Sequence, residues 1–154
     1  MTARVDVTID VAVSPEAVWG LISDLPRMGE WSPENESVTL RGASAPAAGV
    51  RFTGANAHGR HRWSTAGRIT EFSAPHRLAF RITYLGLKVA DWEYSIQPFA
   101  GGCRVTETWI DRRGAVFRLG GKAATGVADR ASHNRDSMRA TLEAIKAAAE
   151  APGA

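Results

Sequence analysis

The sequence predicts an α+β fold, in which an antiparallel β-sheet packs against one long C-terminal helix and two short helices follow the first strand. Three observations lead to this prediction. Residues 122–149 are the only long stretch whose apolar residues recur at helical spacing. Most of residues 4–111 form short runs of alternating apolar and polar residues, which is typical of strands with one buried face. The connections between these runs are short, which favours an antiparallel meander.

The segment from Lys122 to Ala149 carries one apolar stripe. Alanine is abundant in it, no proline interrupts it, and Pro152 and Gly153 follow it as a stop signal. A helix with a single apolar stripe requires a surface to cover, and the preceding strands supply one. We expect the Gly-rich residues 115–121 to form a loop or a frayed first turn before this helix. The stripe consists of Val127, Ala131, Asn134, Met138, Leu142, Ile145 and Ala149.

The first strand and the two short helices follow from the N-terminal residues. Residues 4–13 alternate almost without exception, so five apolar side chains share one face. Ser14 is a favoured N-cap residue, and Pro15 is favoured at the first helical position. The same pattern restarts at residue 23, which predicts a second short helix that ends near Glu30. Neither helix is long enough to be stable without tertiary contacts.

Six further strands are predicted between Trp31 and the C-terminal helix. Gly59-Arg60 and Gly101-Gly102 have the composition of tight turns, and Pro75 interrupts the pattern between two strands. No repeat, low-complexity block or linker divides the chain, so we expect one domain over residues 1–154. The predicted strands cover residues 37–41, 50–58, 61–72, 77–84, 88–98 and 104–111.

Composition and charge narrow the classes of function. A chain of 154 residues with 44% hydrophobic and 23% charged residues has the composition of a soluble globular domain. It has no run of about 18 apolar residues and no basic-then-apolar leader, so neither a membrane span nor a secretory signal is expected. The single cysteine, Cys103, favours a reducing, cytoplasmic location. The net charge of +3 comes from scattered arginines, and the short basic clusters at 58–62 and 112–113 are typical of solvated turns. Nucleic-acid binding is therefore not expected.

Two local motifs and the order of the elements resemble a known family. Residues 9–19 (IDVAVSPEAVW) form a strand that leads into a Pro-started helix with a Trp, and residues 24–34 (DLPRMGEWSPE) end in a Trp-Ser-Pro turn. With the antiparallel strands and the long C-terminal helix, the chain resembles the bacterial polyketide cyclase/dehydrase and lipid-transport family of the START-like (SRPBCC) superfamily. The resemblance implies the helix-grip fold, in which a curved antiparallel sheet wraps around the C-terminal helix. These motifs define the fold, and no catalytic set shared by the family maps onto this chain.

The helix-grip fold implies a cavity between sheet and helix, because a strongly bent sheet leaves space unless large side chains fill it. The alternation of each strand and the stripe of the helix then predict which side chains face that space. Such a lining is mostly apolar and aromatic with a few polar groups, as small-molecule sites generally are. The predicted ligand-binding residues are Phe52, Asn56, Trp63, Phe80, Tyr84, Trp92, Tyr94, Glu107, Trp109, Val127, Ala131, Asn134 and Met138.

Glu107 is the most informative of these residues. It lies between Val105 and Trp109 in the apolar phase of its strand, and a buried carboxylate is costly unless it is paired. It could pair with an arginine as a structural bridge, or it could anchor a ligand hydroxyl or act as an acid/base group. An error of one residue in the strand phase would place it in solvent instead.

The other candidate acid/base residues are His58, Tyr84 and Asn56. His58 lies at a strand end beside a basic turn, where an exposed position is the simpler interpretation. His133 falls off the apolar stripe of the helix, so we expect it at the surface. No group of His, Cys, Asp and Glu residues has metal-ligand spacing, and no phosphate- or dinucleotide-binding motif is present. Neither a metal nor a cofactor is expected.

Two functions of different classes follow. The first is a binding or carrier protein for a small hydrophobic molecule, such as a lipid, a polyketide or an aromatic compound. The second is an enzyme of the polyketide cyclase/aromatase/dehydratase type, which would use acid/base groups in the same cavity. The lack of a cluster of inward acids and bases favours binding. An interior filled by Trp63, Trp92 and Trp109 would instead indicate that the protein works through a protein partner. Ligand identity and oligomeric state do not follow from the sequence.

Overall fold

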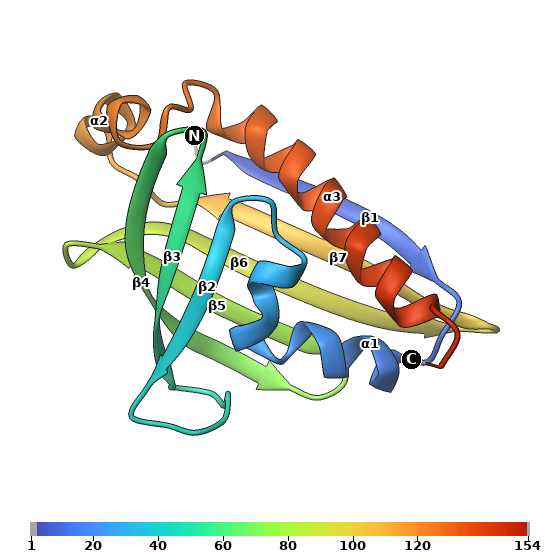
Figure 1. The fold of residues 1–154 in the computed structure, drawn as a ribbon. Coiled ribbons are helices and arrows are strands. Elements are labelled where there is room, and N and C mark those ends of the chain that lie inside the picture. Colours follow the sequence, from blue (N-terminus) through green and yellow to red (C-terminus); the bar gives the residue numbers. More distant parts are fainter. Residues whose placement is uncertain (1–2, 154) are drawn as a thin grey trace.

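The computed structural model describes residues 3–153, and its elements follow the predicted order. The predicted domain, residues 1–154, extends beyond the described residues at both ends. Seven antiparallel strands form one sheet in the order β1-β7-β6-β5-β4-β3-β2 (Figure 1). The elements are β1 (Arg4–Val11), α1 (Pro15–Ile22), the 3₁₀ helix η1 (Leu25–Glu30), β2 (Asn35–Arg41), β3 (Arg51–His58), β4 (His61–Ser73), β5 (Arg77–Tyr84), β6 (Leu87–Phe99), β7 (Gly102–Asp111), α2 (Ala115–Thr125) and α3 (Arg130–Glu150).

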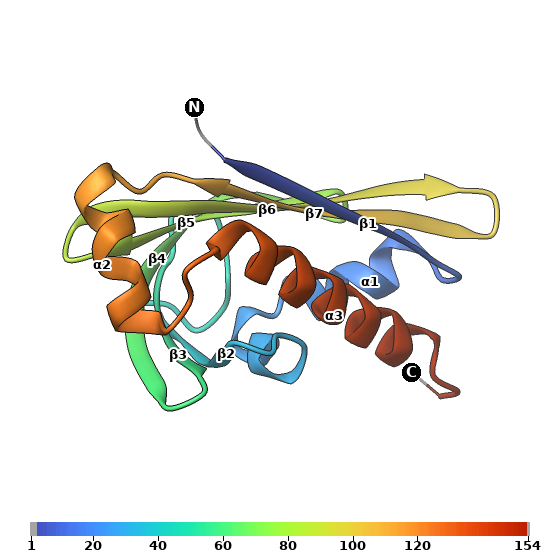
Figure 2. The ribbon, with the colours of Figure 1, turned by 90° about the horizontal axis from the view of Figure 1, so that it is seen from above.

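The helix-grip prediction is confirmed by this arrangement. The sheet bends so that β2 and β3 lie on the side where α3 runs, and α3 lies across the concave face (Figures 1 and 2). The chain order β2 to β7 is also the spatial order, so each of these strands pairs with its neighbour in sequence. β1 closes the far edge by pairing with β7, with Val7 opposite Glu107.

The start of α1 is built as its sequence predicts. Ser14 is the N-cap in an extended conformation, and its hydroxyl oxygen accepts a hydrogen bond from the backbone N–H of Ala17 at 3.3 Å. Pro15 occupies the first turn, where its missing N–H costs no intrahelical bond. Val18 and Ile22 are the buried side chains of this helix. The second predicted helix forms as the 3₁₀ helix η1, with Pro26 in its first turn and the Leu25 side chain buried.

The prediction of one long helix over residues 122–149 is wrong at its N-terminal end. The structure has two helices, and the break lies at Gly126, whose φ of 75° is left-handed and ends α2. A side chain at this position would also meet the ring of His61 at 2.6 Å, so only glycine fits. The Gly-rich residues predicted as a loop belong instead to α2, which begins at Ala115. α3 starts afresh with Asp129 as its N-cap.

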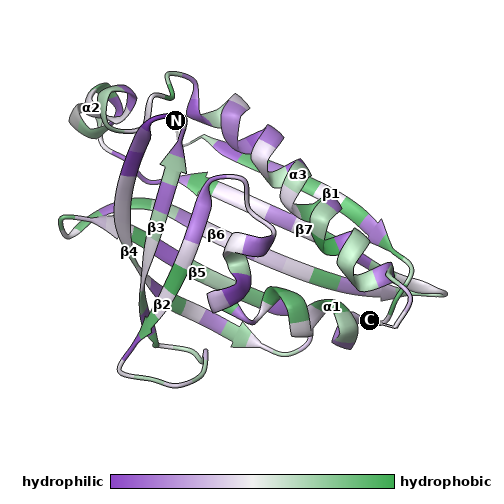
Figure 3. Ribbon diagram, in the orientation of Figure 1, coloured by the Kyte–Doolittle hydropathy of each residue, from purple (hydrophilic) through white to green (hydrophobic). Residues whose placement is uncertain are grey.

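The apolar core lies at the C-terminal end of α3, between this helix, α1 and the sheet. Leu142 and Ile145 of α3 pack there with Val18 of α1 and with Ile96 and Val105 of the sheet. Figure 3 shows the matching pattern, because the N-terminal half of α3 is mostly hydrophilic and its C-terminal half is mostly hydrophobic. The N-terminal half of α3 contributes Met138 to a second, smaller core cluster with Val5, Ala90 and Trp109. No helix among residues 3–153 is long and apolar enough to cross a membrane.

Candidate functional site

A cavity of about 210 Å³ lies between the sheet, the N-terminal half of α3 and α2. Its wall is mainly apolar and aromatic, with polar groups at a few positions. Two aromatic pairs stabilise opposite parts of the wall by edge-to-face contact: Phe52 with Phe80 at a ring separation of 5.6 Å, and Tyr84 with Phe117 at 5.8 Å. The aromatic lining consists of Phe52, Trp63, Phe80, Tyr84, Trp92, Tyr94, Trp109 and Phe117.

Glu107 and Tyr94 form a buried polar pair in this wall. They are directly opposite each other on β7 and β6, so their side chains share one face of the sheet. The hydroxyl of Tyr94 donates a hydrogen bond to Oε1 of Glu107 at 2.7 Å. Glu107 is only 3% exposed, and its other oxygen, Oε2, has no hydrogen-bond partner among residues 3–153. The arginine partner that the sequence left open as one explanation is not present in the described part of the chain, where no cation lies within ion-pair distance of Glu107.

Burial changes the ionisation of both members of this pair. Loss of solvent raises the pKa of Glu107 from 4.5 to about 8, although the hydrogen bond from Tyr94 opposes the shift. Burial likewise raises the pKa of Tyr94 well above its usual range, and the neighbouring Glu107 carboxyl raises it further. At neutral pH Glu107 is therefore mostly a neutral carboxylic acid. Because Oε1 accepts from Tyr94, the acid proton is left for Oε2, which has no hydrogen-bond partner among residues 3–153.

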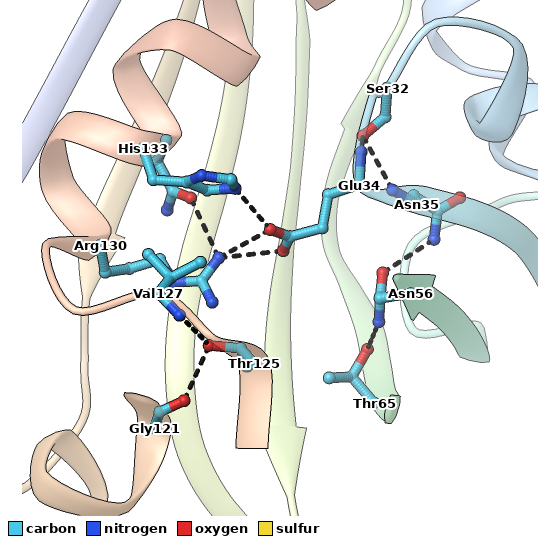
Figure 4. A network of polar contacts seen from close by, with 11 residues as sticks. Ser32, Glu34, Asn35, Asn56, Thr65, Gly121, Thr125, Val127, Arg130 and His133 are labelled. Atoms are coloured by element: carbon cyan, nitrogen blue, oxygen red, sulfur yellow. Dashed lines mark hydrogen bonds and ion pairs between the residues drawn. The ribbon is translucent and has the colours of Figure 1, made fainter. Parts of the chain in front are cut away.

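Glu34 links the sheet side of the cavity to α3. Its carboxylate accepts hydrogen bonds from Nη1 of Arg130 at 2.8 and 3.0 Å and contacts Nε2 of His133 at 2.8 Å (Figure 4). The Arg130 guanidinium also lies 5.9 Å from the centre of the Trp63 ring. The predicted surface position of His133 is wrong: it is half-buried and its ring stacks edge-to-face on His58 at 4.7 Å. A contact between residues 99 positions apart cannot be seen in the helical stripe.

A second polar chain runs across the β2–β3–β4 part of the wall. The amide nitrogen of Asn35 donates to Oδ1 of Asn56 at 3.2 Å, and the amide nitrogen of Asn56 donates to the Thr65 hydroxyl at 3.3 Å (Figure 4). The Ser32 hydroxyl oxygen accepts from the backbone N–H of Asn35 at 3.1 Å and holds the start of β2. These bonds provide partners for most of the polar side-chain atoms on the β2–β3–β4 side of the cavity. Oδ1 of Asn35 is the exception and has no partner within residues 3–153.

The cavity opens beside α2. An open depression between α2 and the β5–β6 turn shares Tyr84, Phe117, Gly121 and Ala124 with the cavity wall. Arg113 lines the same end, but its guanidinium donates to both oxygens of Asp111, at 2.9 and 3.0 Å, and is not available as a free charge. α2 and the turn after β5 therefore border the entrance to the cavity.

Over residues 2–150 the sequence matches the family described as polyketide cyclase / dehydrase and lipid transport. The chain belongs to this family. The resemblance drawn from residues 9–19 and 24–34 is thereby confirmed.

Three relatives illustrate how far the likeness extends. An uncharacterised protein of Mycobacterium tuberculosis is 26% identical over 124 residues, which cover 80% of this chain and 81% of that protein. The solution structure of a Polyketide_cyc-like protein from Corynebacterium glutamicum has a TM-score of 0.63 and 24% identity, over 95% of this chain and 90% of the other. The di-domain ARO/CYC StfQ from the steffimycin biosynthetic pathway has a TM-score of 0.75 and 12% identity, over 97% of this chain and 51% of the other.

Most of the predicted ligand-binding residues lie in the wall of the cavity. Val127 and Ala131 do not: Val127 precedes the first turn of α3, and Ala131 packs against the small core cluster around Trp109. His58 lies outside the wall at the exposed end of β3, as its position beside the turn predicts. The predicted residues in the wall are Phe52, Asn56, Trp63, Phe80, Tyr84, Trp92, Tyr94, Glu107, Trp109, Asn134 and Met138.

The sequence reasoning missed several residues of the wall. Phe117 lies in the segment that was expected to be a loop, and Arg130 lies on the flank of the helical stripe, so no periodicity pointed to either. Glu34 and Asn35 follow the Trp-Ser-Pro turn, where alternation had not yet started. Thr65 could have been found, since it shares the phase of Trp63 on β4. No group of three or more His, Cys, Asp or Glu residues within 3–153 is arranged to hold a metal ion.

Proposed function

We propose that this protein binds a small hydrophobic molecule in the cavity between its sheet and α3. The observation that carries the proposal is the cavity itself: about 210 Å³, lined by eight aromatic side chains and closed at its inner end by the core. An apolar cavity of about 150 Å³ holds benzene, and sites for drug-sized ligands have about 300–1,000 Å³. The size therefore supports a compound with one or two rings over a long acyl chain. The family description supports a small hydrophobic ligand in general.

A second function, catalysis of the cyclase, aromatase or dehydratase type, is supported by one feature. The raised pKa of Glu107, about 8, lies close to physiological pH, which is where a general acid or base works best. The same group lines the cavity next to Tyr94, so it would be within reach of a bound molecule. One acid/base pair is a sparse catalytic set, because the other charged groups of the wall, Glu34, Arg113 and Arg130, are held in ion pairs. We therefore place binding before catalysis. The cytoplasmic location and the lack of nucleic-acid partners, both expected from the sequence, stay predictions.

The test is to fill the cavity while Glu107 and Tyr94 stay unchanged. Ser137 lies on α3 in the cavity wall, and Ala140 lies on the same helix with its side chain exposed and outside the wall. Ser137→Phe places a ring in the space, while Ala140→Phe adds a similar bulk to the outer face. Native mass spectrometry and organic extraction of each purified protein would show which one carries a bound compound. Calorimetric titration with naphthalene derivatives would give the affinities.

We expect the wild type and Ala140→Phe to retain and bind the same compounds, and Ser137→Phe to lose at least about tenfold in affinity, because one aromatic ring displaces most of a one- or two-ring ligand. Equal binding by Ser137→Phe and the wild type would contradict the proposal. Conversion of a bound compound by the wild type, with retention but no conversion by Glu107→Gln, would decide for the enzymatic function instead.

A further inference from the structure

We propose that the cavity selects neutral ligands that carry an acceptor oxygen, such as an aryl ketone, and that this oxygen accepts a hydrogen bond from the Glu107 carboxylic acid. The inference rests on the proposed binding function and narrows its ligand class. It predicts that an uncharged carbonyl compound binds more tightly than either an apolar compound or a carboxylate of the same size.

The geometry of the Glu107–Tyr94 pair leaves one polar atom for a ligand. Tyr94 has no remaining proton to donate, because its hydroxyl hydrogen is used on Oε1 of Glu107. Oε2 of Glu107 is buried and without a partner among the described residues, in a residue that lines the cavity. A buried polar atom that lacks a hydrogen bond costs free energy, and a ligand that supplies the missing partner removes this cost. The unpartnered atom therefore indicates a complementary polar atom on the ligand.

The charges around the cavity decide which kind of polar atom this is. Four other ionisable residues line the wall: Glu34, Tyr84, Arg113 and Arg130. Arg113 is bonded to Asp111, and Arg130 is bonded to Glu34, so neither offers Glu107 a counter-ion. The facing stretch of α3 adds the uncharged Asn134, Ser137, Met138 and Thr141. The strand neighbours of Glu107 are Val7 and Tyr94.

A carboxyl group in these surroundings remains protonated and acts as a donor. Desolvation without a compensating cation raises the pKa of Glu107 to about 8, so the neutral acid dominates at pH 6 to 7. A donor on Oε2 matches a ketone, ester or quinone oxygen. It does not favour a fatty acid or another carboxylate, because the charge of such a ligand would leave water for an apolar site whose arginines, Arg113 and Arg130, are already paired. Oδ1 of Asn35 also has no partner among the described residues, but it is an acceptor and cannot donate a hydrogen bond to a carbonyl oxygen.

Three compounds with one skeleton test this inference: 2-acetylnaphthalene, 2-ethylnaphthalene and 2-naphthoate. They match in ring system and nearly in volume, and they differ in whether they carry a neutral acceptor, no polar atom or a charge. Their affinities for the wild type, Glu107→Gln and the double variant Glu107→Leu/Tyr94→Phe would be measured by calorimetry at pH 6 and at pH 9.5. Glu107→Gln keeps the shape and a donor N–H but cannot ionise. The double variant removes both the acid and the Tyr94 hydroxyl, which Glu107→Leu alone would leave free to donate to the ligand.

For the wild type at pH 6 we expect the ketone to bind about tenfold more tightly than the ethyl compound, the effect of one buried hydrogen bond. The preference should disappear at pH 9.5, where Glu107 is ionised. Glu107→Gln should keep the preference at both pH values. Glu107→Leu/Tyr94→Phe should bind the two neutral compounds with equal affinity.

The results separate this inference from the function on which it rests. If the wild type binds the ketone and the ethyl compound equally at pH 6, or binds 2-naphthoate most tightly, the inference is wrong and the binding function stands. If the wild type binds none of the three compounds, both are overturned. A ketone preference that survives in Glu107→Leu/Tyr94→Phe would assign the acceptor oxygen to a donor outside this pair and also overturn the inference.

Discussion

The buried acid Glu107 should make the stability of this protein fall as the pH rises. The carboxyl is 3% exposed, and its pKa is raised from 4.5 to about 8 by burial. Below pH 4.5 the group is protonated in both the folded and the unfolded chain, so its burial carries no charge penalty. As the pH rises toward 8, the unfolded chain releases the proton and the folded chain keeps it. Stability is therefore lost across this window, and the full penalty is reached above pH 8.

The size of the effect follows from the raised pKa. At about 1.4 kcal/mol per pKa unit, a rise from 4.5 to about 8 corresponds to about 5 kcal/mol. Relaxation of the folded protein around a buried charge lowers the cost, so we expect a measured loss of about 2–5 kcal/mol between pH 5 and pH 9. Domains of this size are stable by about 5–15 kcal/mol in total, so the effect is large enough to measure.

The assay is urea-induced unfolding of the wild type and Glu107→Gln at a series of pH values. The variant keeps the acceptor for Tyr94 and cannot ionise, so the difference between the two curves isolates Glu107 from every other titrating group. Glu143 is an exposed residue of α3, and Glu143→Gln should follow the wild-type curve. Parallel curves for the wild type and Glu107→Gln between pH 5 and pH 9 would refute the reasoning.

Two further predictions concern the walls of the cavity. Glu34→Gln should lower the free energy of unfolding by about 2 kcal/mol, because Arg130 and His133 lose a charged acceptor in a partly buried position; urea unfolding at pH 7 measures this. Gly67→Ala should lower the free energy of unfolding by about 1–3 kcal/mol, because a Cβ at this buried position would overlap the ring of Phe52; thermal and urea unfolding measure this.

Matched variants control these two predictions. Glu30→Gln removes an exposed ion pair with Arg27 and should have a much smaller effect than Glu34→Gln. Gly20→Ala lies in α1 with open space around its Cβ, and it should raise the free energy of unfolding by about 0.5–1 kcal/mol. Loss of stability in Gly20→Ala equal to that in Gly67→Ala, or equal losses in the two Glu→Gln variants, would contradict the proposed packing and pairing.

The alternation of the strands predicted much of the fold and of the cavity wall. Each strand places alternate residues on one face, so Trp92, Tyr94 and the inward position of Glu107 could be derived from their neighbours in sequence. The N-cap at Ser14 was equally local, since the hydroxyl, the proline and the helix lie within a few residues. The sequence predicts such features because the residues that determine them lie only a few positions apart in the chain.

The helix break at Gly126 shows where the local pattern was misread. The apolar stripe continues through this residue, because Val127 lies at helical spacing from Ala131. The backbone nevertheless turns left-handed at Gly126, and His61 of β4 leaves no room there for a side chain. Part of this signal, a glycine within a helical stretch, was present in the sequence. The close approach of β4 was not.

The sequence by itself determined the element order, the inward face of most strands and the family to which the chain belongs, because periodicity and turn residues act over a few positions. The inward face of residues 60–70, in β4, did not follow from it, because residues 64–67 carry little hydrophobic signal. Only the tertiary structure decided that Glu34 joins Arg130 and His133, and that Glu107 meets Tyr94 rather than an arginine. These pairs depend on strand register and on the placement of α3, which bring together residues up to 99 positions apart. The raised pKa of Glu107 also depends on the tertiary structure, because burial and the positions of the nearest charges are properties of the folded chain.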